Sequence, residues 1–239
     1  TKLNSSGAHQ WTTTLGGTLN DTGWDVAVDG SGNVYITGYF QGTVNFGAGD
    51  VTSAGYDDGF ITKLNSSGAH QWTTTFGGTS DDRGYGVAVD GSGNVYITGF
   101  FKGTVDFGAG DVTSAGSYDG FVTKLNSSGA HQWTTTLGGT SHDFGWHVAV
   151  DGSGNVHIAG YFQGTVNFGA GNVTSAGGSD AFVTKLNSAG AHQWTTTLGG
   201  TSNDYGYGVA VDGSGNVHVA GHFQGTVNFG AGNVTSAGG

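Results

Sequence analysis

The sequence predicts an all-β fold, a β-propeller of four near-identical blades with four antiparallel strands each. Two observations predict it. The nine residues VAVDGSGNV recur at 26–34, 87–95, 148–156 and 209–217, always 61 residues apart, and a long fixed period marks a repeat architecture. Apolar residues alternate as in half-buried strands, with no convincing helical period. Since each unit must bury its faces against its neighbours, radially repeated sheets satisfy both observations.

Units counted from TKLN span 1–61, 62–122, 123–183 and 184–239, and we treat 1–239 as one propeller domain. The last unit stops before its third strand, and the first opens with the end of a third strand and a whole fourth one. We therefore expect the two termini to share one blade, which removes two unpaired edges although the junction is about five residues short. Closure within one chain, an eight-bladed ring of two chains and a slice of a longer array are the alternatives.

The strands of the first full blade follow from local composition. We expect the inner strand at 24–28, the turn DGSGN, and a second strand at 34–40, because Gly and Asn tolerate tight hairpin turns. A long connection with a short strand at 43–46 leads to a third strand at 59–64. NSSGA then turns the chain into a fourth strand at 70–76. Strand direction places both short turns on a bottom face and both long connections on a top face.

The runs GGTSNDYGYGVAVDGSGNVHVAG and FVTKLNSSGAHQW, with Gly-Gly after the last strand, resemble the bacterial SBBP-type β-propeller repeat. The resemblance covers the whole chain four times. It implies the propeller fold and a place in large secreted and cell-surface proteins, and it implies no catalytic residues. One segment departs from the family pattern: VNFGAG is longer there and carries an acidic residue and a proline. Nothing about the middle connection is therefore transferred.

Charge and composition narrow the partners. The net charge of −11 comes from 17 Asp against five Lys and Arg83, which argues against nucleic acid and anionic membranes because both need basic patches. No stretch approaches the ~18 apolar residues of a membrane span. Only 10% of residues are charged, so the surface is mostly neutral and polar. We expect an extracellular or cell-surface bacterial protein that meets sugars or copies of itself.

The loop before each inner strand carries the candidate ligand-binding residues. One aromatic residue recurs there, three positions after an aspartate: the pairs are Asp21 with Trp24, Asp82 with Tyr85, Asp143 with Trp146, and Asp204 with Tyr207. An aromatic ring can stack on the C–H face of a sugar while a carboxylate binds its hydroxyl groups. The alternative is that each aspartate fixes its own loop as an Asx-turn.

Metal and cofactor sites are not expected. The turns at Asp29, Asp90, Asp151 and Asp212 space oxygen atoms as a calcium loop does. The sixth and twelfth positions, Val34 and Phe40, lack the glycine and the carboxylate of such loops. We interpret each turn as a hairpin whose aspartate caps backbone amides, with calcium as the alternative. The histidines that gather in units three and four leave a metal site between blades as a second alternative: His142, His147, His157, His218 and His222.

The expected function is non-catalytic binding or adhesion, with a glycan as the ligand class, through the top face that carries the long variable loops. Near-identical blades offer no convergence of different groups on one substrate, which an active site needs. The alternatives are a self-assembling scaffold and a designed or consensus propeller without a natural ligand. A polysaccharide-active enzyme is a further alternative and rests on fold analogy alone.

Overall fold

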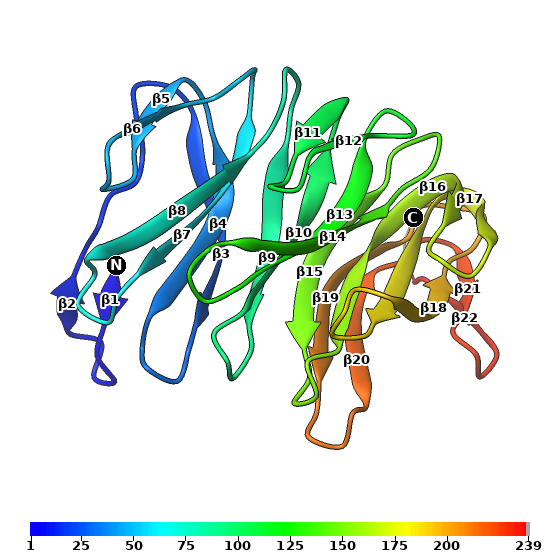
Figure 1. Cartoon of the computed structure of the whole chain (residues 1–239). Helices are drawn as coiled ribbons and strands as arrows, with labels where there is room; N and C mark the ends of the chain where they lie inside the picture. The colour runs from blue at the N-terminus through cyan, green and yellow to red at the C-terminus, as the bar shows by residue number, and fades with distance from the viewer. Residues whose placement is uncertain (238–239) are drawn as a thin grey trace.

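The computed structural model describes residues 1–237, which form β-strands, turns and loops and no helix. Three four-stranded antiparallel sheets stand side by side as successive blades (Figure 1). The inner strands are β3 (Asp21–Val28), β9 (Arg83–Val89), β15 (Phe144–Val150) and β19 (Tyr205–Val211). The second strands are β4 (Val34–Phe40), β10 (Val95–Phe101), β16 (Val156–Asn167) and β20 (Val217–His222). Residues 1–237 contain no helix that is long and apolar enough to cross a membrane.

The outer strands complete the first three blades only. The third strands are β7 (Asp58–Leu64), β13 (Asp119–Leu125) and β17 (Asn172–Leu186), and the fourth strands are β8 (His70–Phe76), β14 (His131–Leu137) and β18 (His192–Leu198). The long connections fold into the hairpins β5 (Thr43–Asn45) with β6 (Asp50–Thr52), β11 (Thr104–Asp106) with β12 (Asp111–Thr113), and β21 (Thr226–Asn228) with β22 (Asn233–Thr235). The expected strand order within a blade is therefore confirmed. The short strand expected at 43–46 is β5, and it pairs with β6.

The DGSGN turn shows why the repeated sequence forms a hairpin. The amides of Ser31 and Asn33 both donate to Oδ1 of Asp29 at 2.9 Å. The Oδ2 atom accepts from the Asn33 side chain at 2.8 Å and from the Tyr35 hydroxyl at 3.0 Å. Gly32 has a φ of 78°, which a residue with a side chain rarely adopts. The predicted hairpin turn, with its aspartate capping amides, is confirmed.

Most of the apolar core lies between neighbouring blades, and a smaller cluster lies within the first unit. One cluster joins Tyr35, Ile61 and Phe76 of the first blade to apolar residues of the second. An equivalent cluster joins the second blade to the third. Burying large apolar side chains in this way supplies the main force that holds blades together.

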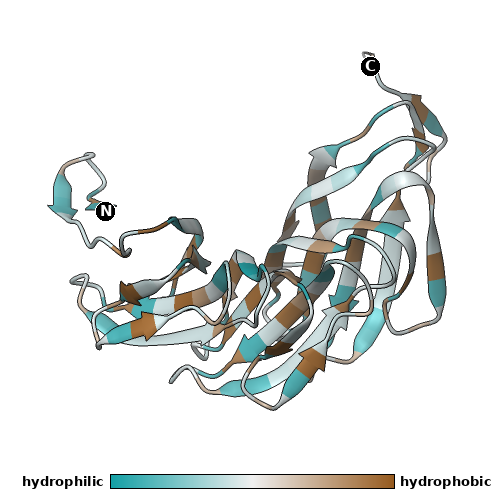
Figure 2. Cartoon of the chain, turned by 90° about the horizontal axis from the view of Figure 1, so that it is seen from above, coloured by the Kyte–Doolittle hydropathy of each residue, from teal (hydrophilic) through white to brown (hydrophobic). Residues whose placement is uncertain are grey.

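The expected blade shared between the termini is not formed by residues 1–237. β1 (Lys2–Leu3) and β2 (His9–Trp11) pair only with each other, and so do β19 and β20. Seen from above, the blades form an open arc with the two ends of the chain at opposite sides (Figure 2). The two parts of the expected blade pack on different blades: β1 and β2 lie beside the first blade, where Nε1 of Trp11 donates to the Ser66 carbonyl at 3.2 Å, whereas β19 and β20 pack on the third blade.

Candidate functional site

A β-bulge sets the position of the candidate aromatic residue in every inner strand. In β3, Gly23 pairs with Gly38 and Asp25 pairs with Thr37, so Trp24 is an extra residue without a partner in β4. The same irregularity occurs in β9, β15 and β19, where the extra residues without a partner are Tyr85, Trp146 and Tyr207. A bulge re-aims a side chain relative to its strand, and here it does so once per repeat.

These bulges need glycine in the neighbouring strand. A Cβ atom at Gly38 would overlap the carbonyl oxygen of Thr22. The same conflict, with the carbonyl two residues before the bulged aromatic residue, occurs at the corresponding glycines of the other units: Gly99, Gly160 and Gly221. The recurring glycine of the second strand is therefore the partner of the bulge.

The four bulged aromatic side chains form one continuous row, which we call the aromatic row: Trp24, Tyr85, Trp146 and Tyr207. The Trp24 and Tyr85 rings meet edge to face with centroids 5.1 Å apart. Tyr85 and Trp146 stack at 4.4 Å with an interplanar angle of 6°, and Trp146 meets Tyr207 edge to face at 5.8 Å. Such offset and edge-to-face contacts are the favoured arrangements of aromatic pairs.

The two ends of the aromatic row are open to solvent. Trp24 is 47% exposed and Tyr207 is 50% exposed, whereas Tyr85 is buried. Nε1 of Trp146 is buried without a hydrogen-bond partner among the described residues. A buried indole N–H usually finds a partner, so this N–H is an unpaired polar group within the row.

The four loop aspartates lie beneath the surface and bind the backbone of their own unit. The glycine amide four residues earlier donates to one carboxylate oxygen at 2.6–2.8 Å. The other oxygen accepts the amide twenty residues later at 2.9–3.3 Å. Asp82, Asp143 and Asp204 are fully or almost fully buried, and Asp21 is half-buried. The structure therefore brings the aromatic residues together but does not place these carboxylates on the same surface.

Burial changes the acidity of two of these groups. Desolvation raises the pKa of Asp143 to about 7, against the opposing effect of the Gly139 and Gln163 amides. Desolvation likewise raises the pKa of Asp82 to about 6, against the amides of Lys102 and Gly78. A neutral carboxyl is cheaper to bury than a charged one. Burial therefore keeps a proton on both groups to a higher pH than is usual for aspartate, up to about pH 7 for Asp143 and about pH 6 for Asp82.

Sequence reasoning missed a second cluster on the top face, centred on Arg83. Nε of Arg83 donates to Oδ2 of the buried Asp57 at 2.8 Å, and a second guanidinium nitrogen contacts the same oxygen. The guanidinium lies 4.4 Å from the ring centroid of Tyr39 and 5.7 Å from that of Phe100. The signal was present, because Arg83 is the only arginine of the chain and lies in a variable loop.

Four further histidines and the turn aspartate Asp151 have local partners. In the outer strands, Nε2 of His9, His70, His131 and His192 lies 2.9–3.0 Å from the hydroxyl of the threonine three residues later. Burial would raise the pKa of Asp151, but hydrogen bonds from Asn155, Ser153 and His157 outweigh it and hold the pKa at about 2. Within residues 1–237, no group of three or more His, Asp or Glu side chains is arranged to hold a metal ion.

Comparison with known proteins adds two relatives. The chain is 27% identical over 244 residues to Regulatory protein FlaEY of Caulobacter vibrioides, an alignment that covers 92% of this chain and 25% of that protein. It is 28% identical over 161 residues to an uncharacterized WD repeat-containing protein of Acanthamoeba polyphaga mimivirus, covering 60% of this chain and 12% of the relative. The chain thus spans at most a quarter of the length of either relative.

A family model described as Beta-propeller repeat matches the chain four times, at residues 10–39, 71–99, 132–161 and 193–222. Each match begins in the strand that precedes an inner strand, which is β2, β8, β14 or β18, and ends in the following second strand, so it contains one bulged aromatic residue. The chain therefore belongs to the SBBP β-propeller repeat family, with one copy of the repeat in each of its four units.

Proposed function

We propose that the chain is a non-catalytic binding module of the bacterial cell exterior and that the aromatic row is its contact surface, with a neutral glycan as ligand. The observation that carries the proposal is the continuity of the row, with Trp24 and Tyr207 exposed at its ends. Exposed rings offer flat apolar faces for the C–H groups of a sugar. The scarcity of charged residues favours a neutral ligand over an ionic one.

The geometry of the carboxylates supports a binding role over catalysis. Asp82 and Asp143 have the raised pKa values that general acids often show. Both are completely buried and hydrogen-bonded to backbone amides on both oxygens. A catalytic carboxyl must reach the substrate, and these two do not. Release of new reducing ends from a panel of polysaccharides would contradict the non-catalytic proposal.

The test is a glycan array followed by titration calorimetry with the best ligand. We expect Trp24→Ala and Tyr207→Ala each to weaken binding about tenfold, because aromatic residues dominate most binding surfaces. Tyr56→Ala is the matched control, since Tyr56 is 71% exposed and lies outside the row. An array without hits, or full affinity in the Trp24→Ala/Tyr207→Ala double variant, would overturn the proposal. A loss only in Tyr56→Ala would move the site to the long loops.

A second candidate is head-to-tail assembly, favoured by unequal burial of one repeated valine. Val87, Val148 and Val209 are at most 5% exposed because a preceding blade packs on them, whereas Val26 in the first blade is 59% exposed. A second copy would cover Val26 as the preceding blade covers its equivalents. Light scattering distinguishes the candidates: a mass of 24.0 kDa at all concentrations rules out assembly, and a multiple of that mass supports it.

A further inference from the structure

Polar grooves lie between complete neighbouring blades on the bottom face, which carries the short turns. One groove, of about 260 Å³, lies between the first and second blades, and another, of about 420 Å³, lies between the second and third. We call them the first and second turn grooves. All their walls come from four-stranded blades and the turns of those blades.

Three turns build each groove. In the second turn groove these are the DGSGN turns that begin at Asp90 and Asp151, and the turn of the third unit that contains Ser188. Lys124 of β13 and Tyr96 of β10 complete the wall. The first turn groove has the same parts one repeat earlier: Asp29, Asp90, Ser127, Lys63 and Tyr35. The sequence repeat therefore encodes the groove as well as the strands.

The lysine of each groove is held in place and keeps hydrogen-bonding capacity. Nζ of Lys124 lies 5.2 Å from the ring centroid of Tyr96 and donates to the Ser188 carbonyl at 3.4 Å. The equivalent distances in the first turn groove are 5.1 and 3.5 Å, for Lys63 with Tyr35 and Ser127. Because an ammonium group has three N–H donors, one hydrogen bond to a carbonyl leaves the others for a ligand.

Serine hydroxyl groups supply further free polar atoms. Ser92, Ser153 and Ser188 line the second turn groove and are exposed. None of these hydroxyl groups has a hydrogen-bond partner within residues 1–237. A hydroxyl group both donates and accepts hydrogen bonds, so these serines complement the lysine, which only donates.

The turn aspartates shape the grooves but have no free lone pairs. Asp90 accepts hydrogen bonds from the amides of Ser92 and Asn94, from the Asn94 side chain and from the Tyr96 hydroxyl. These donors occupy the roughly four lone-pair positions of a carboxylate. A metal ion would have to displace them, and the negative charges of Asp90 and Asp151 oppose an anion.

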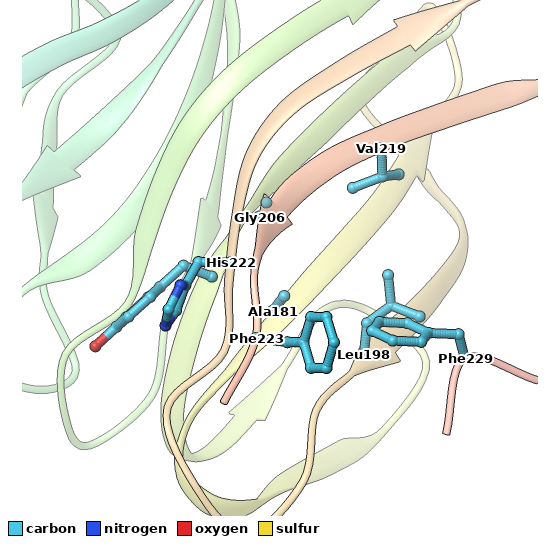
Figure 3. A pocket seen from close by; sticks show the side chains of 9 residues that line it. Ala181, Leu198, Gly206, Val219, His222, Phe223 and Phe229 are labelled. Atoms are coloured by element: carbon cyan, nitrogen blue, oxygen red, sulfur yellow. The ribbon is translucent and has the colours of Figure 1, made fainter. Parts of the chain in front are cut away.

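The groups that line the grooves indicate the class of ligand. The cavity of about 210 Å³ beside β20 has a mostly apolar wall, as Figure 3 shows for Leu198, Phe223 and Phe229. The turn grooves instead offer ammonium, hydroxyl and backbone groups. A ligand that carries many hydroxyl groups and no net charge matches them, because each of its hydroxyls can donate and accept.

We propose that the turn grooves bind sugar units of a neutral glycan, with Lys63 and Lys124 donating to sugar hydroxyls and the free serine hydroxyls completing the contacts. The grooves lie on the face opposite the long connections (Figure 1) and share no residue with the aromatic row. The proposal therefore does not depend on the binding proposed for that row. Two equivalent positions strengthen binding to a polymeric glycan through avidity.

The experiment titrates the whole chain, labelled with nitrogen-15, with maltohexaose, cellohexaose and laminarihexaose, and with hexagalacturonate as an anionic comparison. We expect a neutral hexasaccharide to shift the amide resonances of Gly91 and Gly152, which line the second turn groove, and hexagalacturonate to shift neither. No shift with any neutral hexasaccharide, or a stronger effect of hexagalacturonate, would overturn the proposal. Shifts confined to Tyr85 and its neighbours would also overturn it and would support the aromatic row instead.

Protein variants test the assigned residues with the hexasaccharide that binds best. Lys63→Met/Lys124→Met keeps the aliphatic part of each side chain and removes the ammonium groups. We expect about tenfold weaker binding, since a hydrogen bond from a charged donor contributes at least that factor. Lys102→Met is the matched control, because Lys102 lies outside both grooves at the start of a long connection, and we expect it to bind as the unaltered chain does.

A second variant blocks both grooves at once. Ser92 lines the first and the second turn groove and is exposed, so Ser92→Tyr fills both while the fold is kept. We expect this variant to lose binding with an unchanged far-ultraviolet circular dichroism spectrum. Full affinity in Ser92→Tyr or in Lys63→Met/Lys124→Met, or an equal loss in Lys102→Met, would overturn the proposal.

Discussion

Asp143 carries a carboxyl group whose surroundings oppose its charge. It is completely buried, and its two hydrogen-bond donors are amides of its own unit. Its pKa of about 7 lies above the value near 4 of an unfolded chain. The folded state therefore binds a proton that the unfolded state releases between these two pH values. This contribution to stability is complete below about pH 4 and is lost as the pH rises to about 7.

The first prediction concerns Asp143→Asn. We expect the melting temperature of the unaltered chain to fall by several degrees between pH 4 and pH 7, and that of Asp143→Asn to fall less, because the amide side chain does not titrate. The variant is also less stable at pH 4 by about 1–3 kcal/mol, since its NH₂ group faces a backbone donor. Calorimetric scans across this range measure both effects. Asp111→Asn, at an exposed position of β12, is the control; parallel pH curves for Asp143→Asn and the unaltered chain would refute the pKa.

At the scale of the element, the inner strand depends on its bulge and on one glycine across from it. Gly99 of β10 faces the bulge of β9, and a Cβ atom there would overlap the carbonyl oxygen of Arg83. The strand has no room to relax, because it is paired on both edges. The same glycine recurs in all four units for the same reason.

The second prediction follows from this close approach. Gly99→Ala is expected to reduce the free energy of unfolding by about 1–3 kcal/mol, the usual cost of adding an atom to a packed site. Gly91→Ala is the matched control, because a Cβ atom at Gly91 has no neighbour within 4 Å. Urea titration measures both variants. An equal effect of the two substitutions would show that the bulge relaxes.

Sequence reasoning recovered the strands, their order and the DGSGN turn, because each is encoded by alternation and by turn residues within a few positions. It did not find the bulge, because one extra residue is not visible in a short alternating pattern. Gly84 and Gly86 on either side of Tyr85 were the available signal. It also expected a shared blade, which is not formed by the described residues. Closure depends on the angle between blades, and side chains such as Phe76 and Phe107 set that angle by the way they fill the space between sheets. The four aromatic positions were selected one by one as candidate ligand-binding residues. Their contacts with one another, like the burial of the aspartates, depend on packing that composition does not reveal.

At the scale of the whole molecule, one tryptophan per blade links each blade to the next. Nε1 of Trp72 donates to the Ser127 carbonyl, and Nε1 of Trp133 donates to the Ser188 carbonyl, both at 3.2 Å. Trp11 makes the same contact with Ser66. Trp194 occupies the equivalent position of the third blade and is 36% exposed, with no described turn of a following blade to accept its N–H.

The third prediction compares two chemically identical changes. Trp133→Phe removes a hydrogen bond between blades while keeping an aromatic ring, and we expect a loss of about 0.5–1.5 kcal/mol. Trp194→Phe removes an N–H group that has no such acceptor, and its effect should be close to zero. Chemical denaturation followed by circular dichroism measures the difference. Equal losses would show that the ring contacts, not the hydrogen bonds, couple the blades.

The tryptophan contacts reach only from one blade to its neighbour, and this has a consequence for how the molecule opens. Stability in such a chain is a sum of units and nearest-neighbour interfaces. β10 belongs to the middle blade, which packs between two complete blades. β1, β2, β19 and β20 belong to two-stranded pairs at the ends of the arc. Amide hydrogen exchange should therefore be slowest in the middle blade and become faster toward both ends of the arc, so that the molecule frays from its ends before it unfolds as a whole.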